Sequence, residues 1–435
     1  MRMPDQSNAA SNTPLTRRNL LAATVASGLA LPAWAQFRVE IAGVGTTQMP
    51  ISIPSFLNES VAGQAVAAIV RADLERSGQF RVVDAPAGLS ETSQPAFSEW
   101  RGRNVDAVAG GSATRLADGR IDLRFKLWDV VKGADLGGES HLVAPDDVRV
   151  GAHRIADWIY QKLTGERGVF ATRLAYVTKV GSRYKLIISD SDGEGGQEAL
   201  TSHEPIISPA WSPDGREVAY VSFEARKAVI YTQDLFTRAR RQVAAYRGTN
   251  SAPAYSPDGS QIAMTLSREG GSQLFIVNRT GGDPRRLTQS SAIDTEPVFS
   301  PDGRSIYFVS DRGGAPQIYR MSSSGGGVER VTFVGGYNIS PDVSPDGRTL
   351  AYITRTGGNF KLCVMDLASG TVNQITDTLD DESPSFSPNG RLLVYATRSA
   401  GRDVLMTTTL DGKIKAKLIA STADMRTPTW GPFTR

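Results

Sequence analysis

The side chains in this sequence that could do chemistry include an aspartate that recurs at a fixed spacing. It lies in the tetrapeptide Ser-Pro-Asp-Gly, which first ends at Gly215 and later returns with asparagine at Asn389. Repeated carboxylates could act as general acids or bases, or bind a metal ion. The neighbouring residues favour a different role, because proline presets the first position of a turn and glycine takes the positive φ that closes a hairpin. We interpret these aspartates as turn residues.

The other reactive groups are few and scattered. The three histidines, His141, His153 and His203, fall in different segments and lack the spacing of metal ligands. The chain has no Gly-x-Ser-x-Gly sequence and no phosphate-binding glycine loop, and we expect Gly110-Gly-Ser and Gly195-Gly to be turns. The sequence therefore predicts no catalytic residue, no metal site and no cofactor.

Charge and cysteine content exclude further classes. The formal net charge is +3, and the first 35 residues supply +2 of it (three arginines minus one aspartate), which leaves +1. A charge this small gives no reason to expect nucleic-acid binding. The single cysteine, Cys363, lies in a strand-like run and cannot form an internal disulfide, so we expect a buried thiol in a fold stabilised by packing.

The tetrapeptide belongs to a longer repeat that predicts the architecture. Its proline falls at positions 213, 257, 301, 345, 388 and, in a shortened last copy, 432, so the steps are 44, 44, 44, 43 and 44 residues. Strand-like segments between the copies give four strands per period, which is typical of propeller blades. The strand after the turn also occurs six times, beginning at Leu174 with no turn before it. We predict a six-bladed β-propeller over residues 169–435, closed by the C-terminal strand near Trp430.

Residues 36–168 carry no such repeat and predict an α/β domain. Strands are expected at 37–42, 49–54, 80–83, 106–109 and 121–127. Helices are expected at 62–77 and from 148 to a stop at Gly165. His153 lies on the second helix, where we expect it to be a surface residue, and His203 is expected on a loop at one rim of the propeller.

Residues 1–35 have the features of a cleaved signal peptide. Arg17 and Arg18 precede an apolar run at 20–31, and Ala33-Trp-Ala35 supplies a small-residue cleavage pattern. As a helix the run would rise about 18 Å, too short for a hydrocarbon core of roughly 30 Å. The arginine pair suits either the twin-arginine route or the general secretory route. The mature protein is expected to be exported and not to span a membrane.

The loops that lead into the repeated turn motif should project from one end of the ring. They carry the polar and acidic residues His203, Glu204, Thr249, Asn250, Thr295, Glu296, Asn338 and Glu382. Such a ring of groups can bind a folded partner or an extended peptide, although solvated loops have the same composition. We take these residues as the candidate partner-binding surface.

Several segments together resemble the TolB family, the periplasmic propellers of the Tol-Pal system. The resemblance rests on Pro-Ile-Ser-Ile-Pro-Ser-Phe at 50–56, Asp-Leu-Glu-Arg-Ser-Gly-Gln-Phe at 73–80, the six blades and the closing Pro428-Thr-Trp-Gly-Pro432. It covers essentially the whole mature chain. It implies a monomeric, non-enzymatic adaptor that links the outer-membrane lipoprotein Pal to the inner-membrane protein TolA, together with the other Tol-Pal components. The implied role is outer-membrane integrity and envelope invagination during cell division.

The resemblance also implies where these partners bind. Pal would dock over one end of the propeller channel, at the rim residues above; relatives carry a histidine at the position of Thr249. The mature N-terminal arm, Phe37, Arg38, Val39, Glu40 and Ile41, would bind TolA, and a strand-like arm can do so by adding to a sheet edge. The competing hypothesis is a propeller subunit of an exported peptidase or lyase, which the missing nucleophile, metal cluster and cofactor loop disfavour.

Overall fold

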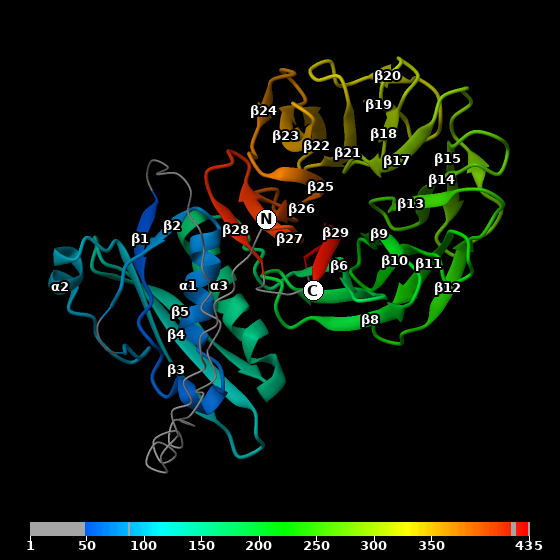
Figure 1. The fold of residues 1–435 in the computed structure, drawn as a ribbon. Coiled ribbons are helices and arrows are strands. Elements are labelled where there is room, and N and C mark those ends of the chain that lie inside the picture. Colours follow the sequence, from blue (N-terminus) through cyan, green and yellow to red (C-terminus); the bar gives the residue numbers. More distant parts are fainter. Residues whose placement is uncertain (1–47, 86–87, 419–422, 434–435) are drawn as a thin grey trace, which may run out of the picture. The chain divides into compact units, whose positions relative to one another are not determined.

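The computed structural model describes residues 48–85, 88–418 and 423–433 (Figure 1). The expected signal peptide, the strand expected at 37–42 and the arm residues Phe37 to Ile41 lie outside the described residues. Within the described ranges, no helix has both the length and the apolar character needed to cross a membrane.

The N-terminal part is a five-stranded mixed sheet with the order β2-β1-β3-β4-β5. Its strands are β1 (Met49–Ser52), β2 (Phe80–Val82), β3 (Ala107–Arg115), β4 (Ile121–Asp129) and β5 (Ala134–Val143). Strand β1 runs parallel to β2 and β3, whereas β3, β4 and β5 pair antiparallel. The helices are α1 (Val66–Arg76), α2 (Phe97–Gly102) and α3 (Val148–Thr164), with short 3₁₀ turns at Glu59–Ala62 and Pro145–Asp147.

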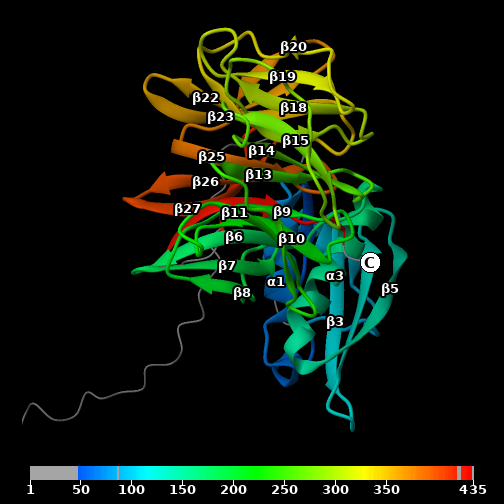
Figure 2. The same cartoon turned by 90° about the vertical axis from the view of Figure 1, so that its right-hand side faces the viewer.

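Helices α1 and α3 pack against each other and share one hydrophobic core with the sheet (Figures 1 and 2). Val70 of α1, Ile155 of α3 and Leu123 of β4 are fully buried in it. The alternation of β4 and the helical spacing of α1 and α3 predicted these contacts. Helix α3 ends at Gly165, whose φ of 79° stops the helix as expected.

The prediction for one glycine pair of this sheet was wrong. Gly110-Gly-Ser is not a turn but part of strand β3. A Cβ on Gly111 would lie 2.5 Å from the ring of Phe56, and Leu57 donates its N–H to the carbonyl of Gly111 at 2.8 Å. The glycine therefore allows another chain segment to approach the strand closely, which is a second common use of glycine in a sheet. Gly195, with φ 65°, does lie in a turn.

The propeller has six antiparallel sheets of four strands each. The first blade contains β6 (Arg173–Val180), β7 (Arg183–Asp190), β8 (Gln197–Ser202) and the C-terminal strand β29 (Asp424–Trp430), and the second contains β9 (Ile206–Trp211), β10 (Glu217–Ser222), β11 (Val229–Asp234) and β12 (Arg240–Ala244). The third contains β13 (Asn250–Tyr255), β14 (Gln261–Leu266), β15 (Gln273–Asn278) and β16 (Arg285–Arg286), and the fourth contains β17 (Asp294–Phe299), β18 (Ser305–Ser310), β19 (Gln317–Ser322) and β20 (Glu329–Arg330). The fifth contains β21 (Asn338–Val343), β22 (Thr349–Thr356), β23 (Asn359–Asp366) and β24 (Val372–Gln374), and the sixth contains β25 (Leu379–Phe386), β26 (Leu392–Ser399), β27 (Arg402–Thr409) and β28 (Lys415–Lys417).

The C-terminal strand completes the first blade, as predicted. Strand β29 pairs antiparallel with β6, from Asp424 opposite Lys179 to Trp430 opposite Leu174, and Figure 1 shows the red strand beside the green one. The indole of Trp430 is buried and donates its N–H to Thr172 Oγ1 at 2.8 Å. The ring is thus held closed by the two ends of the propeller chain.

The repeated turn has the structural role that its sequence indicates. In the first copy, Asp214 Oδ1 accepts hydrogen bonds from the Ser212 hydroxyl at 2.6 Å and from the Arg216 N–H at 3.0 Å, and Gly215 has a φ of 68°. The same contacts recur in the other four copies, with Asn389 as acceptor in the fifth. Burial opposes ionisation of Asp214, but these hydrogen bonds and Arg279 lower its pKa to about 2.

Candidate functional site

The propeller has candidate sites on two sides. One is the rim formed by the loops that lead into the inner strands, which are the strands that line the channel: β9, β13, β17, β21, β25 and β29. His203 and Glu204 lie exposed in the turn between β8 and β9, as predicted for a rim loop. Thr249 is exposed just before β13, and its N–H donates to Ser267 Oγ at 2.7 Å. The same loops, and the start of β25, expose large apolar side chains that the sequence analysis did not select: Ile293, Phe333, Val334 and Leu379.

Asn250 and Asn338 do not face outward, which corrects the expectation that they belong to the exposed surface of the rim. Both are 0% exposed. Asn250 Oδ1 accepts from the N–H of Tyr246 at 2.9 Å, and its amide donates to the Tyr246 carbonyl at 2.8 Å. Asn338 donates to Gln317 Oε1 at 2.8 Å and to the Val334 carbonyl at 2.9 Å. These buried amides hold the rim loops in shape through hydrogen bonds to the loop backbone.

The inner strands share a second feature that the sequence analysis missed. The residue just before the first proline of each repeat has a left-handed backbone, with φ between 46° and 52°: Ser208, Ala252, Glu296, Ser340, Ser383 and Thr427. Each of these residues sits at a break in the pairing register with the next strand, which marks a bulge. The bulges line a cavity of about 210 Å³ within the ring.

Two carboxylates in this cavity join neighbouring blades. Glu296 Oε2 accepts the N–H of Ser340 at 2.7 Å, and Asp342 Oδ2 accepts the N–H of Phe386 at 2.7 Å. Burial raises the pKa of Glu296 and raises the pKa of Asp342 to about 7. Glu296 therefore belongs to the lining of the channel and not to the outer rim. Thr295, beside it, accepts a hydrogen bond from Thr265 Oγ1 at 3.3 Å.

Glu382 lies in a small pocket of about 290 Å³ close to Arg426 and Asp403. Burial raises the pKa of its carboxyl group, and its Oε1 has no hydrogen-bond partner among the described residues. Of the predicted rim set, His203, Glu204 and Thr249 are thus the residues that the structure places on the exposed surface.

The second site lies at the opposite ends of the inner strands, where the turn motifs are, and centres on His153. The expectation that His153 is a surface residue was wrong, because its side chain is 1% exposed. Its Nδ1 lies 2.6 Å from Asp73 Oδ2 of α1, and its Nε2 lies 3.7 Å from Asp190 Oδ2 and 3.6 Å from Asp192 Oδ2 of the propeller. A single buried imidazole therefore faces carboxylates from both domains.

Two arginines complete this buried cluster. Arg76 of α1 donates to Asp73 Oδ1 at 2.9 Å and to Ser191 Oγ at 3.2 Å, so it also crosses between the domains. Arg149, one helical turn before His153, donates to Asp192 Oδ2. We name Asp73, Arg76, Arg149, His153, Asp190 and Asp192 the interdomain cluster.

Electrostatics in the cluster favour a protonated imidazole. Burial alone would lower the pKa of His153, but attraction to Asp73 and contacts with Asp190 and Asp192 outweigh it and raise the pKa to about 10. Burial also opposes ionisation of Asp192, yet His153, Arg76 and Arg149 hold the pKa of that carboxyl below its usual value. Three cations then balance three carboxylates.

Three residues of the interdomain cluster also form a possible set of metal ligands. Ligand atoms of Asp73, His153 and Asp192 lie within 4.8 Å of one another. The carboxylate oxygens are already used, however, by the imidazole N–H, by Arg76 and by Arg149. A divalent cation would have to displace a guanidinium and a proton. The donor set fits a closed ion network better than a metal site.

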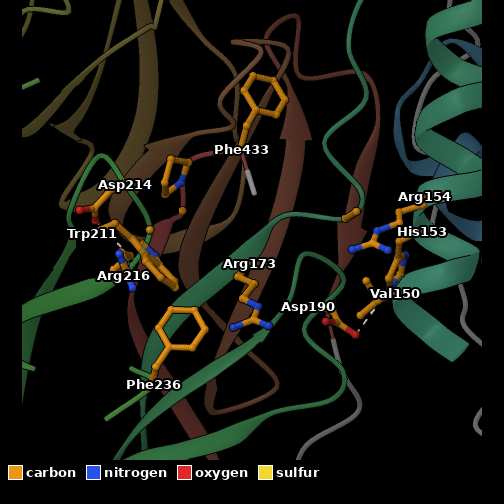
Figure 3. Close-up of a pocket in the computed structure, with 14 residues that line it drawn as sticks. Val150, His153, Arg154, Arg173, Asp190, Trp211, Asp214, Arg216, Phe236 and Phe433 are labelled. Atoms are coloured by element: carbon orange, nitrogen blue, oxygen red, sulfur yellow. Dashed lines mark hydrogen bonds and ion pairs between the residues drawn. The ribbon is translucent and has the colours of Figure 1, made fainter. Parts of the chain in front are cut away.

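A pocket of about 580 Å³ adjoins the cluster (Figure 3). One part of it is lined by His153 and Arg154 of α3 and by Asp190 at the end of β7. The rest is lined by the first turn motif, the β11–β12 turn and the C-terminal segment, including Trp211, Arg216, Phe236 and Phe433. The sequence analysis did not select this site, although Asp73 and Arg76 lie in the family segment at 73–80 and Asp190 and Asp192 lie in the Ser-Asp-Ser-Asp-Gly run at 189–193.

Comparisons with known proteins cover nearly the whole chain. The family model described as the TolB amino-terminal domain matches residues 37–136, and the model described as the TolB beta propeller domain matches residues 160–434. A Tol-Pal system protein TolB from Polaromonas sp. strain JS666 is 66% identical over 98% of this chain and 100% of its own length. The chain belongs to the TolB family.

Other TolB relatives agree in sequence and structure. The Tol-Pal system protein TolB of Polaromonas naphthalenivorans is 65% identical over 98% of this chain and 100% of its own. The crystal structure of TolB from Acinetobacter baumannii superposes with a TM-score of 0.84 at 37% identity, covering 92% of this chain and 100% of that one. The mixed N-terminal sheet, the six four-stranded blades and the C-terminal strand in the first blade therefore form a TolB-family fold.

Proposed function

We propose that this protein is a non-enzymatic periplasmic adaptor that links the outer-membrane lipoprotein Pal to the inner-membrane protein TolA. The full-length similarity to proteins described as Tol-Pal system protein TolB carries this proposal. The role would be outer-membrane integrity and invagination during cell division, with the protein acting as a monomer. The proposed chain organisation is a signal peptide at 1–35, an α/β domain at 36–168 and the propeller at 169–435.

The rim supports the proposed Pal contact. The polar residues His203, Glu204 and Thr249 are exposed there, and so are the apolar side chains of Ile293, Phe333 and Val334. Exposed apolar groups beside polar ones are typical of protein-binding surfaces. Asn250, Asn338 and Asp294 would act indirectly, because they are buried and hold these loops in position.

Titration of the mature protein with purified Pal tests the first half of the proposal. We expect binding at micromolar concentration or tighter, weakened at least about tenfold by Thr249→Arg, because a long charged side chain would be forced into the interface. Thr371→Arg is the matched control, since Thr371 is exposed in the β23–β24 turn at the other end of the strands. Absence of binding to the wild-type protein would refute the adaptor role.

The N-terminal arm is tested separately. Deletion of residues 37–41 should abolish binding to TolA and leave the affinity for Pal within about twofold, because the proposed TolA contact is a short strand added to a sheet edge. Retained TolA binding would place that contact elsewhere in the chain. Sequencing the N-terminus of the periplasmic protein would check cleavage after Ala35.

A further inference from the structure

The pocket beside the interdomain cluster has an excess of positive charge. Arg154, Arg173 and Arg216 line it, all three are exposed, and none forms an ion pair with a carboxylate of the described residues. They come from three separate elements, and Figure 3 shows them spread across the pocket from α3 to the first turn motif. The pocket lies at the turn-motif end of the inner strands, and the rim lies at their other end.

The two carboxylates of the pocket do not neutralise these arginines. Asp190 faces Arg149 and His153, at 3.5 and 3.7 Å, from the side of the interdomain cluster. Asp214 pairs with Arg279 at 3.0 Å and accepts hydrogen bonds within its own turn. Each carboxylate already has a cation outside the set of three arginines. The pocket therefore presents a positive potential to anything that enters it.

Aromatic rings lie between the arginines. Phe236 is 71% exposed at the tip of the β11–β12 turn, and Trp211 and Phe433 line the same space. A phenylalanine this exposed contributes nothing to the core, and rings beside guanidinium groups suit a ligand that has both apolar and anionic parts. The volume, about 580 Å³, lies within the range of roughly 300–1,000 Å³ found for small-ligand sites.

We propose that this pocket binds a short acidic peptide segment that carries an aromatic or other large apolar side chain. The three arginines come from separate elements around the pocket, and this favours a peptide over a simple anion, because acidic residues along a chain can pair with groups on different walls. The bound segment would contact α3 and the propeller at once, so its binding would also stabilise the present arrangement of the two domains.

The test uses the mature full-length protein and a fluorescein-labelled peptide of alternating glutamate and tryptophan. Fluorescence anisotropy should show saturable binding that weakens as salt is added. The double change Arg173→Gln and Arg216→Gln should raise the Kd about tenfold or more, because each removes a charge-assisted hydrogen bond. Arg348→Gln is the matched control, since Arg348 follows the turn glycine of another blade as Arg216 does here.

The outcomes separate the proposal from its rivals. Loss of binding when glutamine replaces glutamate in the peptide, and a several-fold loss when alanine replaces tryptophan or with Phe236→Ser, would support it. Phe236→Ser is informative even if an arginine variant folds poorly, because Phe236 lies outside the core. Equal affinity of the double variant and the wild type would overturn the proposal, and so would displacement of the peptide by an equal concentration of inorganic phosphate.

Discussion

At the scale of single residues, His153 has the most consequential position in this molecule. It is enclosed by Asp73, Asp190 and Asp192, which come from two domains, and it carries one of the three positive charges that balance them. Removing one member of a buried ion network leaves the others without compensation, and this costs more than the pair contributes while it is intact. The interdomain cluster should therefore be sensitive to single changes.

The change His153→Ala is expected to lower the free energy of unfolding by about 3–5 kcal/mol, because Asp73 and Asp192 would remain buried without their cation. Urea-induced unfolding followed by circular dichroism measures this. The control is His203→Ala on the exposed rim loop, for which a change below about 0.5 kcal/mol is expected. A similar effect of both substitutions would show that the cluster contributes little.

The pH dependence gives a second test of the same residue. The folded pKa of His153 is raised to about 10, above the value near 6.5 of an unfolded histidine. Its contribution is therefore fully present below pH 6.5 and is lost as the pH rises toward 10. The difference in unfolding free energy between wild type and His153→Ala should shrink over that interval. A difference that stays constant from pH 6 to pH 10 would contradict a protonated imidazole.

The residue scale is also where sequence reasoning was weakest. The apolar stripe of α3 predicted the helix and its end at Gly165, but not which polar positions another domain would cover. His153 and its partner Asp190 are far apart in the sequence, and no local pattern joins them. Asn250 was misjudged for a related reason, because a polar residue in a loop is usually exposed, and here its amide closes the loop from inside.

At the scale of elements, the inner strand of every blade has a strained backbone at the same position, the residue before its first proline. Six residues without the freedom of glycine adopt a left-handed backbone at the bulge, which costs an L-amino acid about 1–2 kcal/mol each. Thr427 is the most demanding case, because it is β-branched and its Oγ1 has no hydrogen-bond partner among the described residues. The bulge turns each inner strand so that its proline faces the channel cavity.

We expect Thr427→Gly to raise the free energy of unfolding by about 0.5–1 kcal/mol, because glycine relieves the left-handed strain at a smaller entropic cost. Thr429→Gly in the same strand is the control. Thr429 has an ordinary backbone, so glycine there brings only the entropic cost and should lower stability by about 0.5–1 kcal/mol. Paired thermal and urea unfolding curves measure both. A loss of stability in both variants would show that no strain is stored at Thr427.

The elements that the sequence predicted are those with a strong period. The turn motif located the blades and the clasp between β29 and β6, and the alternation of β4 identified a half-buried strand. One strand and one α-helix, besides the short 3₁₀ turns, were not predicted. Strand β5 lies at the edge of its sheet with most side chains outside the core, and it contains two glycines, so it shows no alternation. Helix α2 has six residues, too few for a helical period.

At the scale of the whole molecule, the ring is closed by contacts that repeat around it. In five of the six copies, the proline of the turn motif lies next to the glycine of the turn in the following blade. A Cβ on Gly259 would lie 3.6 Å from Pro213, and one on Gly215 would lie 3.3 Å from Pro432. The last contact joins the C-terminal copy to the first complete one. Together with β29 and Trp430, this contact joins the two ends of the propeller chain by the same kind of packing that joins the other blades.

Trp430→Ala is expected to lower the free energy of unfolding by about 3–5 kcal/mol, because it removes a buried indole from the clasp and leaves Thr172 without its donor. Hydrogen exchange should show the loss of protection first in β6 and β29. Phe333→Ala is the control, since its ring is 74% exposed and its removal should cost below about 0.5 kcal/mol. Uniform loss of protection in all six blades would argue that the clasp is not the weakest boundary.

The path of the last residues has a practical consequence for work on this protein. Gly431 donates its N–H to the carbonyl of Arg173 at 2.8 Å, where the chain enters the propeller from the α/β domain, and Phe433 lines the arginine-rich pocket. A purification tag or fluorescent protein fused after residue 435 would therefore begin two residues beyond Phe433, a residue of that pocket, which lies at the opposite end of the strands from the rim. Such a fusion would leave the proposed Pal-binding rim free but could crowd a peptide in the pocket. A small environment-sensitive dye attached to the C-terminus would instead report on whether the pocket is occupied.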